Sequence, residues 1–156
     1  MLDSSIILFI SRVFHIIGFT LGLAMSFSLL LLYLIIRKNK NLLDIMKLIR
    51  LLILFQIITN IISTLSGIFR LNFTTVIQDQ SKLTIFIPKM IVFSLSLIII
   101  IFLFYLFSKF ISDLATQPYR NNSLTSKQDK ISVIFLFINM ILMSLAFLLG
   151  GSLVIF

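Results

Sequence analysis

His15 is the residue of this chain with the most distinctive chemistry. It is the only histidine among 156 residues, and the sequence contains no cysteine. The lack of cysteine excludes disulfides, thiolate metal sites, iron–sulfur clusters and thiol catalysis. An imidazole can ligate a metal ion or haem iron, and it can also hydrogen-bond a quinone. His15 is therefore the first candidate for a metal- or cofactor-binding residue.

Two cations and a Ser-Gly pair are expected to lie near His15. Arg12 precedes it by one helical turn, and Lys89 follows Pro88, a residue type that is favoured in the first turn of a helix. Such cations can bind anionic groups, for example the propionates of haem. The sequence predicts a cofactor site made by the following residues: His15, Arg12, Lys89, Ser66 and Gly67. In the alternative interpretation the two cations extend to lipid headgroups, and His15 forms hydrogen bonds within the protein.

The single histidine limits which cofactor can bind. Haem with two histidine ligands requires a second copy of the chain or another subunit. His/Met ligation within the chain could use Met25, Met90 or Met143. Copper ordinarily takes more His, Met or Cys ligands than this region supplies, so haem b is preferred over copper. The sequence contains no Ser/His/Asp set, no intramembrane carboxylate pair, no HExxH and no phosphate loop, so it predicts no catalytic residues.

Four long apolar runs are the elements that must position these residues. Hydrophobic residues make up 60% of the chain, well above the roughly 45–50% of a soluble globular domain. Each run lacks Lys, Arg, Asp and Glu and has about the 20 residues that a bilayer-spanning helix needs. The first run has neither a basic segment before it nor a cleavage site, so we expect a retained helix rather than a signal peptide. The runs are Val13–Ile36, Leu51–Phe69, Met90–Ser108 and Ile131–Phe156.

We therefore expect an all-α, polytopic membrane protein. Residues 1–156 are expected to form a single transmembrane domain, in which four helices make an antiparallel bundle. The expected helices cover about 5–36, 42–69, 83–110 and 131–156.

Polar and small residues recur every three or four positions within these helices, so each set occupies one helical face. Gly18 and Gly22 form a GxxxG motif, which lets a second helix approach closely. Helix packing is the favoured interpretation, and the alternatives are room for a flat ligand beside the glycines or a polar pathway. The faces consist of Ser11, His15, Gly18, Gly22 and Ser26, of Gln56, Asn60, Thr64 and Gly67, and of Asn139, Met143, Ala146 and Gly150.

The basic residues lie between the apolar runs. The net charge is +8, from 13 Lys and Arg against five Asp. Because they flank spans and form no patch, these residues indicate lipid headgroups as partners and argue against nucleic acid. The positive-inside rule places the first and third connections in the cytoplasm and both termini outside, in a membrane that is expected to be prokaryotic. Nine basic residues belong to those connections, namely Arg37, Lys38, Lys40, Lys47, Arg50, Lys109, Arg120, Lys127 and Lys130; the other side has Arg12, Arg70, Lys82 and Lys89.

The segment Ser11–Gly18 (SRVFHIIG) resembles the start of the first span in small membrane proteins related to copper-resistance protein D. The second span of that group tends to end in a Ser-Gly pair, matched by Ser66 and Gly67, and the third tends to carry a lysine near its start, matched by Lys89. HemJ-type protoporphyrinogen oxidases, which are membrane proteins associated with haem b, have similar His and Lys placements. The Trp-Gly-Gly that usually follows the first-span histidine is missing here. The resemblance implies a four-helix membrane protein with a haem- or copper-associated site that includes His15.

Two functions follow from these observations. The first is a four-span membrane protein with a haem- or metal-associated site near the outer face, around His15. The second is a non-catalytic accessory or structural subunit of a larger membrane complex, for example a respiratory one. In both cases the lipid bilayer is a partner, and a second copy of the chain or other membrane subunits are further candidates.

Overall fold

The computed structural model describes residues 4–36, 42–70, 80–116 and 126–155, and each of these stretches is α-helical. The helices are α1 (Ser4–Ile36), α2 (Leu42–Arg70), α4 (Gln80–Thr116) and α5 (Ser126–Ile155). The expectation of an all-α protein is confirmed for these residues. Each helix contains a segment that is long and apolar enough to cross a membrane: Phe9–Ile35, Leu43–Gly67, Leu83–Thr116 and Lys127–Leu149.

Many hydroxyl groups inside the helices bond to their own helix. Thr20, Thr64 and Ser144 each donate to the carbonyl four residues earlier, at 2.7–2.9 Å. Such a bond satisfies a hydroxyl without help from another element. The helical backbone likewise pairs its interior N–H and C=O groups within one segment, which an apolar environment strongly favours. These runs are therefore helical although they are rich in β-branched isoleucine.

The third connection is shorter than the sequence predicts. Ile111–Lys130 is expected to be a solvated link, but α4 continues to residue 116 and α5 already begins at residue 126. Contacts with the interior explain the difference. Leu114 packs against the buried core, and Asp129 accepts a hydrogen bond from the Tyr33 hydroxyl at 3.0 Å. These contacts extend both helices beyond the purely apolar runs.

Pro88 lies inside α4, and this corrects its expected place in the first turn. The helix begins at Gln80, two turns before the proline. Proline has no N–H, so position 88 cannot donate to the carbonyl of residue 84, and its ring crowds that carbonyl. Helices in an apolar environment tolerate such a residue because neighbouring groups re-satisfy the backbone. Lys89 therefore lies in the interior of α4 and not at its start.

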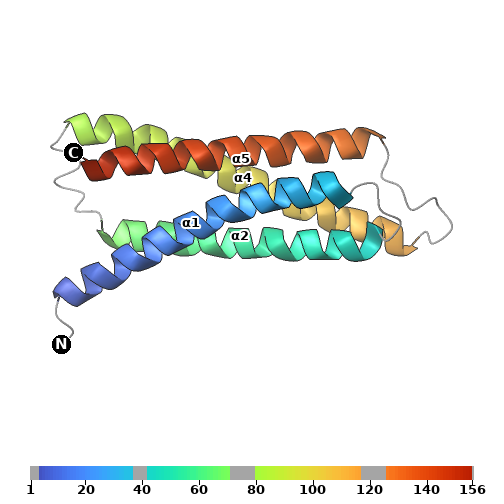
Figure 1. Cartoon of the computed structure of the whole chain (residues 1–156), viewed down its shortest axis with the longest axis horizontal. Helices are drawn as coiled ribbons and strands as arrows, with labels where there is room; N and C mark the ends of the chain where they lie inside the picture. The colour runs from blue at the N-terminus through green and yellow to red at the C-terminus, as the bar shows by residue number, and fades with distance from the viewer. Residues whose placement is uncertain (1–3, 37–41, 71–79, 117–125, 156) are drawn as a thin grey trace.

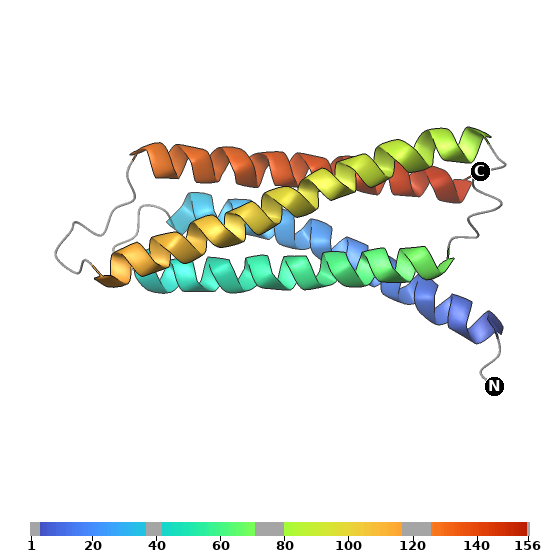
Figure 2. The ribbon, with the colours of Figure 1, turned by 180° about the vertical axis from the view of Figure 1, so that it is seen from behind.

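The four helices lie side by side, and the chain reverses direction from each helix to the next (Figure 1, Figure 2). α1 packs against α2 and α5, and α4 packs against the same two helices. Side chains also meet across the middle. Phe19 of α1 stacks with Phe93 of α4, and Asn139 of α5 bonds to Gln56 of α2. The helices therefore share one interior.

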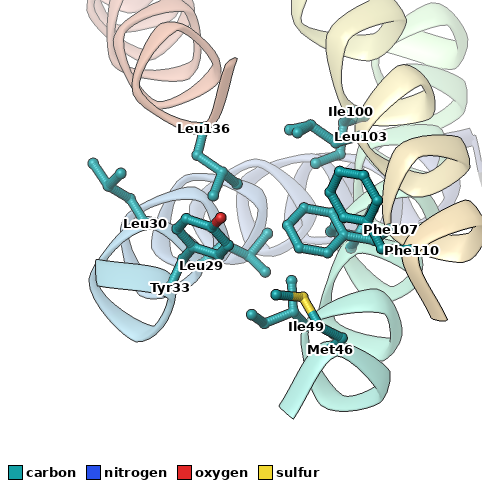
Figure 3. Close-up of a cluster of buried hydrophobic side chains, with 11 residues drawn as sticks. Leu29, Leu30, Tyr33, Met46, Ile49, Ile100, Leu103, Phe107, Phe110 and Leu136 are labelled. Carbon is teal, nitrogen blue, oxygen red and sulfur yellow. The ribbon is translucent and has the colours of Figure 1, made fainter. Parts of the chain in front are cut away.

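The larger apolar cluster of this interior lies where α1 ends and α2 begins, and Figure 3 shows side chains from all four helices meeting there. Tyr33 and Phe107 are fully buried and meet edge to face, with ring centroids 5.8 Å apart. A smaller cluster lies towards the start of α1 and consists of Phe19, Phe93, Met143 and Ala146. The space between the two clusters is polar.

The outward faces of the helices are apolar as well. Phe9, Ile98 and Leu148 are 63–67% exposed, and many other large apolar side chains share this surface. Soluble monomers rarely expose large contiguous apolar areas. The arrangement is therefore consistent with a membrane protein.

Candidate functional site

His15 lies on the face of α1 that packs against α2. Its Nδ1 atom is 2.7 Å from the carbonyl oxygen of Ser63, and the Ser63 hydroxyl lies 3.4 Å from the same nitrogen. A carbonyl oxygen can only accept, so Nδ1 carries the proton in the shorter contact, and in a neutral imidazole Nε2 then holds the lone pair. Metal-ligating histidines are usually oriented in this way, by donation from their second nitrogen.

Gly67 lies beside His15, and the Ser66 hydroxyl and His15 Nδ1 both contact the Ser63 carbonyl. The Ser11 hydroxyl donates to the Ser66 carbonyl at 2.6 Å, and the Ser66 hydroxyl donates to Ile62 of its own helix. A Cβ atom added to Gly67 would lie 3.1 Å from both Cε1 and Nδ1 of His15. The imidazole therefore occupies the space that this glycine leaves. Through these contacts His15, Ser11, Ser66 and Gly67 attach the first half of α1 to the end of α2.

Phe19 connects His15 to Lys89. The Phe19 ring stacks with the His15 ring at a centroid distance of 6.2 Å, and the Lys89 ammonium lies 5.7 Å from the Phe19 centroid. A cation over an aromatic ring is stabilised by about 0.5–2 kcal/mol, depending on how far it is desolvated. Phe93 and Phe147 stack on Phe19 from α4 and α5. The predicted residues His15 and Lys89 are thus brought to one aromatic cluster.

The sequence pattern does not single out Phe19, although one signal was present. Phe19 follows His15 by four positions, and side chains at this spacing are neighbours on a helix. In a chain with 17 phenylalanines, however, such a pair is ordinary. The contact with Ser63 could not be predicted either, because a backbone carbonyl partner leaves no trace in residue types.

Two other predicted contributors are placed differently: Arg12 lies at the surface, and Met143 packs with Phe19 and Phe93 in the smaller apolar cluster. The Arg12 side chain is exposed, so it stands at the edge of the site. Met143 is fully buried against Gly22, with its Cε 3.1 Å from the position of a Cβ added there. Gly22 follows His15 by seven residues, or about 10 Å along the helix axis. Met143 is therefore not placed beside His15.

The ligand types around His15 decide which cofactors fit. Among the residues that the structure describes, no three His, Cys, Asp or Glu side chains gather as a metal site. Copper and zinc sites built from several such side chains consequently find no matching donor set here. Haem needs as little as one protein ligand. His15 is the residue of this cluster whose side chain can serve as such a ligand.

Four buried polar residues form a second group, which we call the central amide cluster: Gln56, Asn60, Ser96 and Asn139, all 0% exposed. The Ser96 hydroxyl donates to Asn139 Oδ1 at 2.8 Å, and Asn139 Nδ2 donates to Gln56 Oε1 at 3.4 Å. Gln56 Nε2 and both amide atoms of Asn60 have no hydrogen-bond partner among the described residues. A buried polar group left in this way costs about 1–3 kcal/mol.

The two glycines of the GxxxG motif bring α1 close to α2. A Cβ on Gly18 would lie 3.0 Å from the Thr59 carbonyl oxygen, and one on Gly22 would lie 2.5 Å from Asn60 Oδ1. Neither position has room for a larger residue without a shift. The interpretation of this motif as a helix-packing element is confirmed.

Comparison of the chain with models of known protein families returned no match, and comparisons with curated proteins and with solved structures returned none either.

Proposed function

We propose that this chain is an integral membrane protein whose four helices cross the bilayer as an antiparallel bundle. Four helices of sufficient length and apolarity support the proposal. Their outward apolar side chains would face lipid tails, while the polar side chains point into the shared interior. In a membrane this division is the favourable one, because unpaired polar groups are costly in hydrocarbon.

The distribution of basic residues supports an orientation with both termini outside. Nine of the 13 Lys and Arg residues belong to the first and third connections or to the helix ends next to them. In this orientation the cluster of His15, Phe19 and Lys89 lies towards the outer face of a prokaryotic cell membrane. Reporter fusions at residues 40 and 120 test the orientation. Cytoplasmic activity at both positions is expected, and activity on the outer side at both would reverse it.

For the site itself we propose a haem-associated function, with haem b held by His15. The observation that supports it is the 2.7 Å contact of Nδ1 with the Ser63 carbonyl, since ligating histidines are usually held by such a bond from the second ring nitrogen. Haem would supply redox chemistry when bound. Lys89 and the exposed Arg12 would provide cations for its propionates. The resemblance to copper-resistance protein D and HemJ-type proteins points to His15 and Lys89 as well.

A non-catalytic accessory role in a larger membrane complex is the second candidate. A specific observation favours it, namely that the polar groups near His15 are already hydrogen-bonded. Ser11 and the Nδ1 atom of His15 bond from α1 to carbonyls of α2, and the Ser66 hydroxyl bonds within α2. In this role His15 has a packing function only, and partners would cover part of the apolar outer surface.

Absorption spectra of the full-length protein, purified in detergent with haem supplied, separate the two roles. We compare the wild type with His15→Ala, His15→Asn and the exposed control Thr20→Ala. An asparagine amide nitrogen can replace Nδ1 as the donor to Ser63, but it offers nothing at the position of Nε2. Under the haem proposal, the wild type and Thr20→Ala show a Soret band and both His15 variants lose it.

Two results would contradict the haem proposal. One is a wild-type protein that stays colourless after titration with haem, and the other is a Soret band that persists in His15→Asn. If His15→Ala alone lowers the melting temperature and His15→Asn restores it in a colourless protein, His15 serves packing. Co-purification of that protein with larger membrane subunits would then support the accessory role.

A further inference from the structure

The central amide cluster lies in the interior between the two apolar clusters, separate from His15. Its members come from three helices: Gln56 and Asn60 from α2, Ser96 from α4 and Asn139 from α5. One chain of hydrogen bonds leads from Ser96 through Asn139 to Gln56. This chain ends at Gln56, and Asn60 takes no part in it.

The atoms without partners in the described part of the chain have mixed polarity. Gln56 contributes N–H donors, and Asn60 contributes N–H donors together with a carbonyl acceptor. Turning the Asn60 amide over exchanges the positions of donor and acceptor but leaves both present. A cation would be repelled by the N–H groups, and an anion would be repelled by the carbonyl. Water donates and accepts, and a buried water typically makes about three hydrogen bonds to groups of this kind.

The spacing of the two amides suits a single bridging molecule. Gln56 and Asn60 are four residues apart on α2, so they lie one turn apart on the same face, with about 5–6 Å between their Cβ atoms. Gly22 of α1 faces Asn60 without a side chain, and Asn60 Oδ1 extends into the space that a Cβ would fill. The unpartnered atoms therefore lie at one place on the buried face of α2.

Apolar side chains close this point on both sides. Ile53, one turn from Gln56, belongs to the larger cluster and is 0% exposed, and Met143, one turn from Asn139, belongs to the smaller cluster and is also 0% exposed. A molecule held here is cut off from both ends of the helices. We infer that the interior contains an internal water-binding site, in which a long-lived water bridges the side-chain amides of Gln56 and Asn60.

Nuclear magnetic resonance of the full-length protein in lipid nanodiscs tests the site. The protein carries ¹⁵N in the side-chain amides of Asn and Gln, and rotating-frame spectra separate dipolar contacts with water from proton exchange. We expect dipolar cross-peaks between water and the side-chain amides of Gln56 and Asn60. The sign of these cross-peaks should be that of a bound water whose residence time is longer than nanoseconds. Loss of one signal pair in Asn60→Leu or Gln56→Leu assigns each resonance.

The variants also test bridging. In Asn60→Leu the dipolar cross-peak between water and the Gln56 amide should weaken at least several-fold, because the water loses one of its hydrogen-bond partners. In Thr20→Ala, an exposed change on α1, both contacts should be unchanged. Amide signals of the wild type without dipolar contact to water would overturn the inference, and so would an undiminished Gln56 contact in Asn60→Leu. If Asn60→Leu does not fold, Asn60→Ala provides the same comparison, because alanine also lacks both polar atoms.

Discussion

Gly18→Ala tests whether the glycines of α1 set the distance to α2. The added Cβ would lie 3.0 Å from the Thr59 carbonyl oxygen, 3.1 Å from the Ser63 nitrogen and 3.2 Å from the Ser63 Cβ. Ordinary contact begins at about 3.4 Å, so α1 must move away by about 0.2–0.4 Å. Two of the three atoms are backbone, and no rotamer change can remove them. The shift would also lengthen the contact from His15 to the Ser63 carbonyl.

Two opposing effects determine the size of the change. Overpacking a close contact typically costs about 1–3 kcal/mol. Replacing glycine by alanine in a helix gains up to about 1 kcal/mol, because the unfolded glycine has more backbone freedom. With a mid-range cost of about 2 kcal/mol and a gain of about 1 kcal/mol, we expect Gly18→Ala to lower the free energy of unfolding by about 1 kcal/mol. Ala24→Gly, at an exposed position of the same helix, measures the backbone term separately and should cost about 1 kcal/mol or less.

Thiol reactivity provides the measurement. The chain has no cysteine, so a single one placed at the fully buried position 146 (Ala146→Cys) reacts with an alkylating reagent only when the protein opens. The rate of labelling in the Gly18→Ala and Ala24→Gly backgrounds then gives the change in stability. A Gly18→Ala protein as stable as the parent, or more stable, would show that α1 and α2 have room to spare and would refute the reasoning.

Two hydrogen bonds of the interior can be tested by substitution and thermal unfolding in detergent, each with a matched comparison variant. Tyr33→Phe removes the donor to Asp129 and should cost about 0.5–1.5 kcal/mol, whereas Asp129→Asn keeps an acceptor and should cost less; equal losses would contradict this assignment. Ser96→Ala leaves the buried Asn139 carbonyl without its donor and should cost about 1–3 kcal/mol. The matched control Ser108→Ala removes a bond within its own helix and should cost less than 0.5 kcal/mol, roughly the effect of a surface change; a similar loss in both would contradict the role of Ser96.

The helices and their inward faces could be predicted from the sequence because each depends on local spacing. The face from Ser11 to Gly22 and the face from Gln56 to Gly67 do meet, and His15 lies beside Gly67. The place of Pro88 could not be predicted, because an apolar environment lets a helix continue through a proline, and the residue types do not show where such a helix begins. The partners of His15 were missed for the same reason: one is a backbone carbonyl, and the other is an ordinary phenylalanine.

The two glycines of α1 face different kinds of atoms, and this has a consequence for sequence divergence. Gly18 meets the backbone of α2, so no substitution on α2 can make room for a larger residue there. Gly22 meets mainly the side chain of Asn60, so a change at position 22 can be compensated by a smaller residue at position 60. Position 18 should therefore stay glycine in related chains, while positions 22 and 60 should change together.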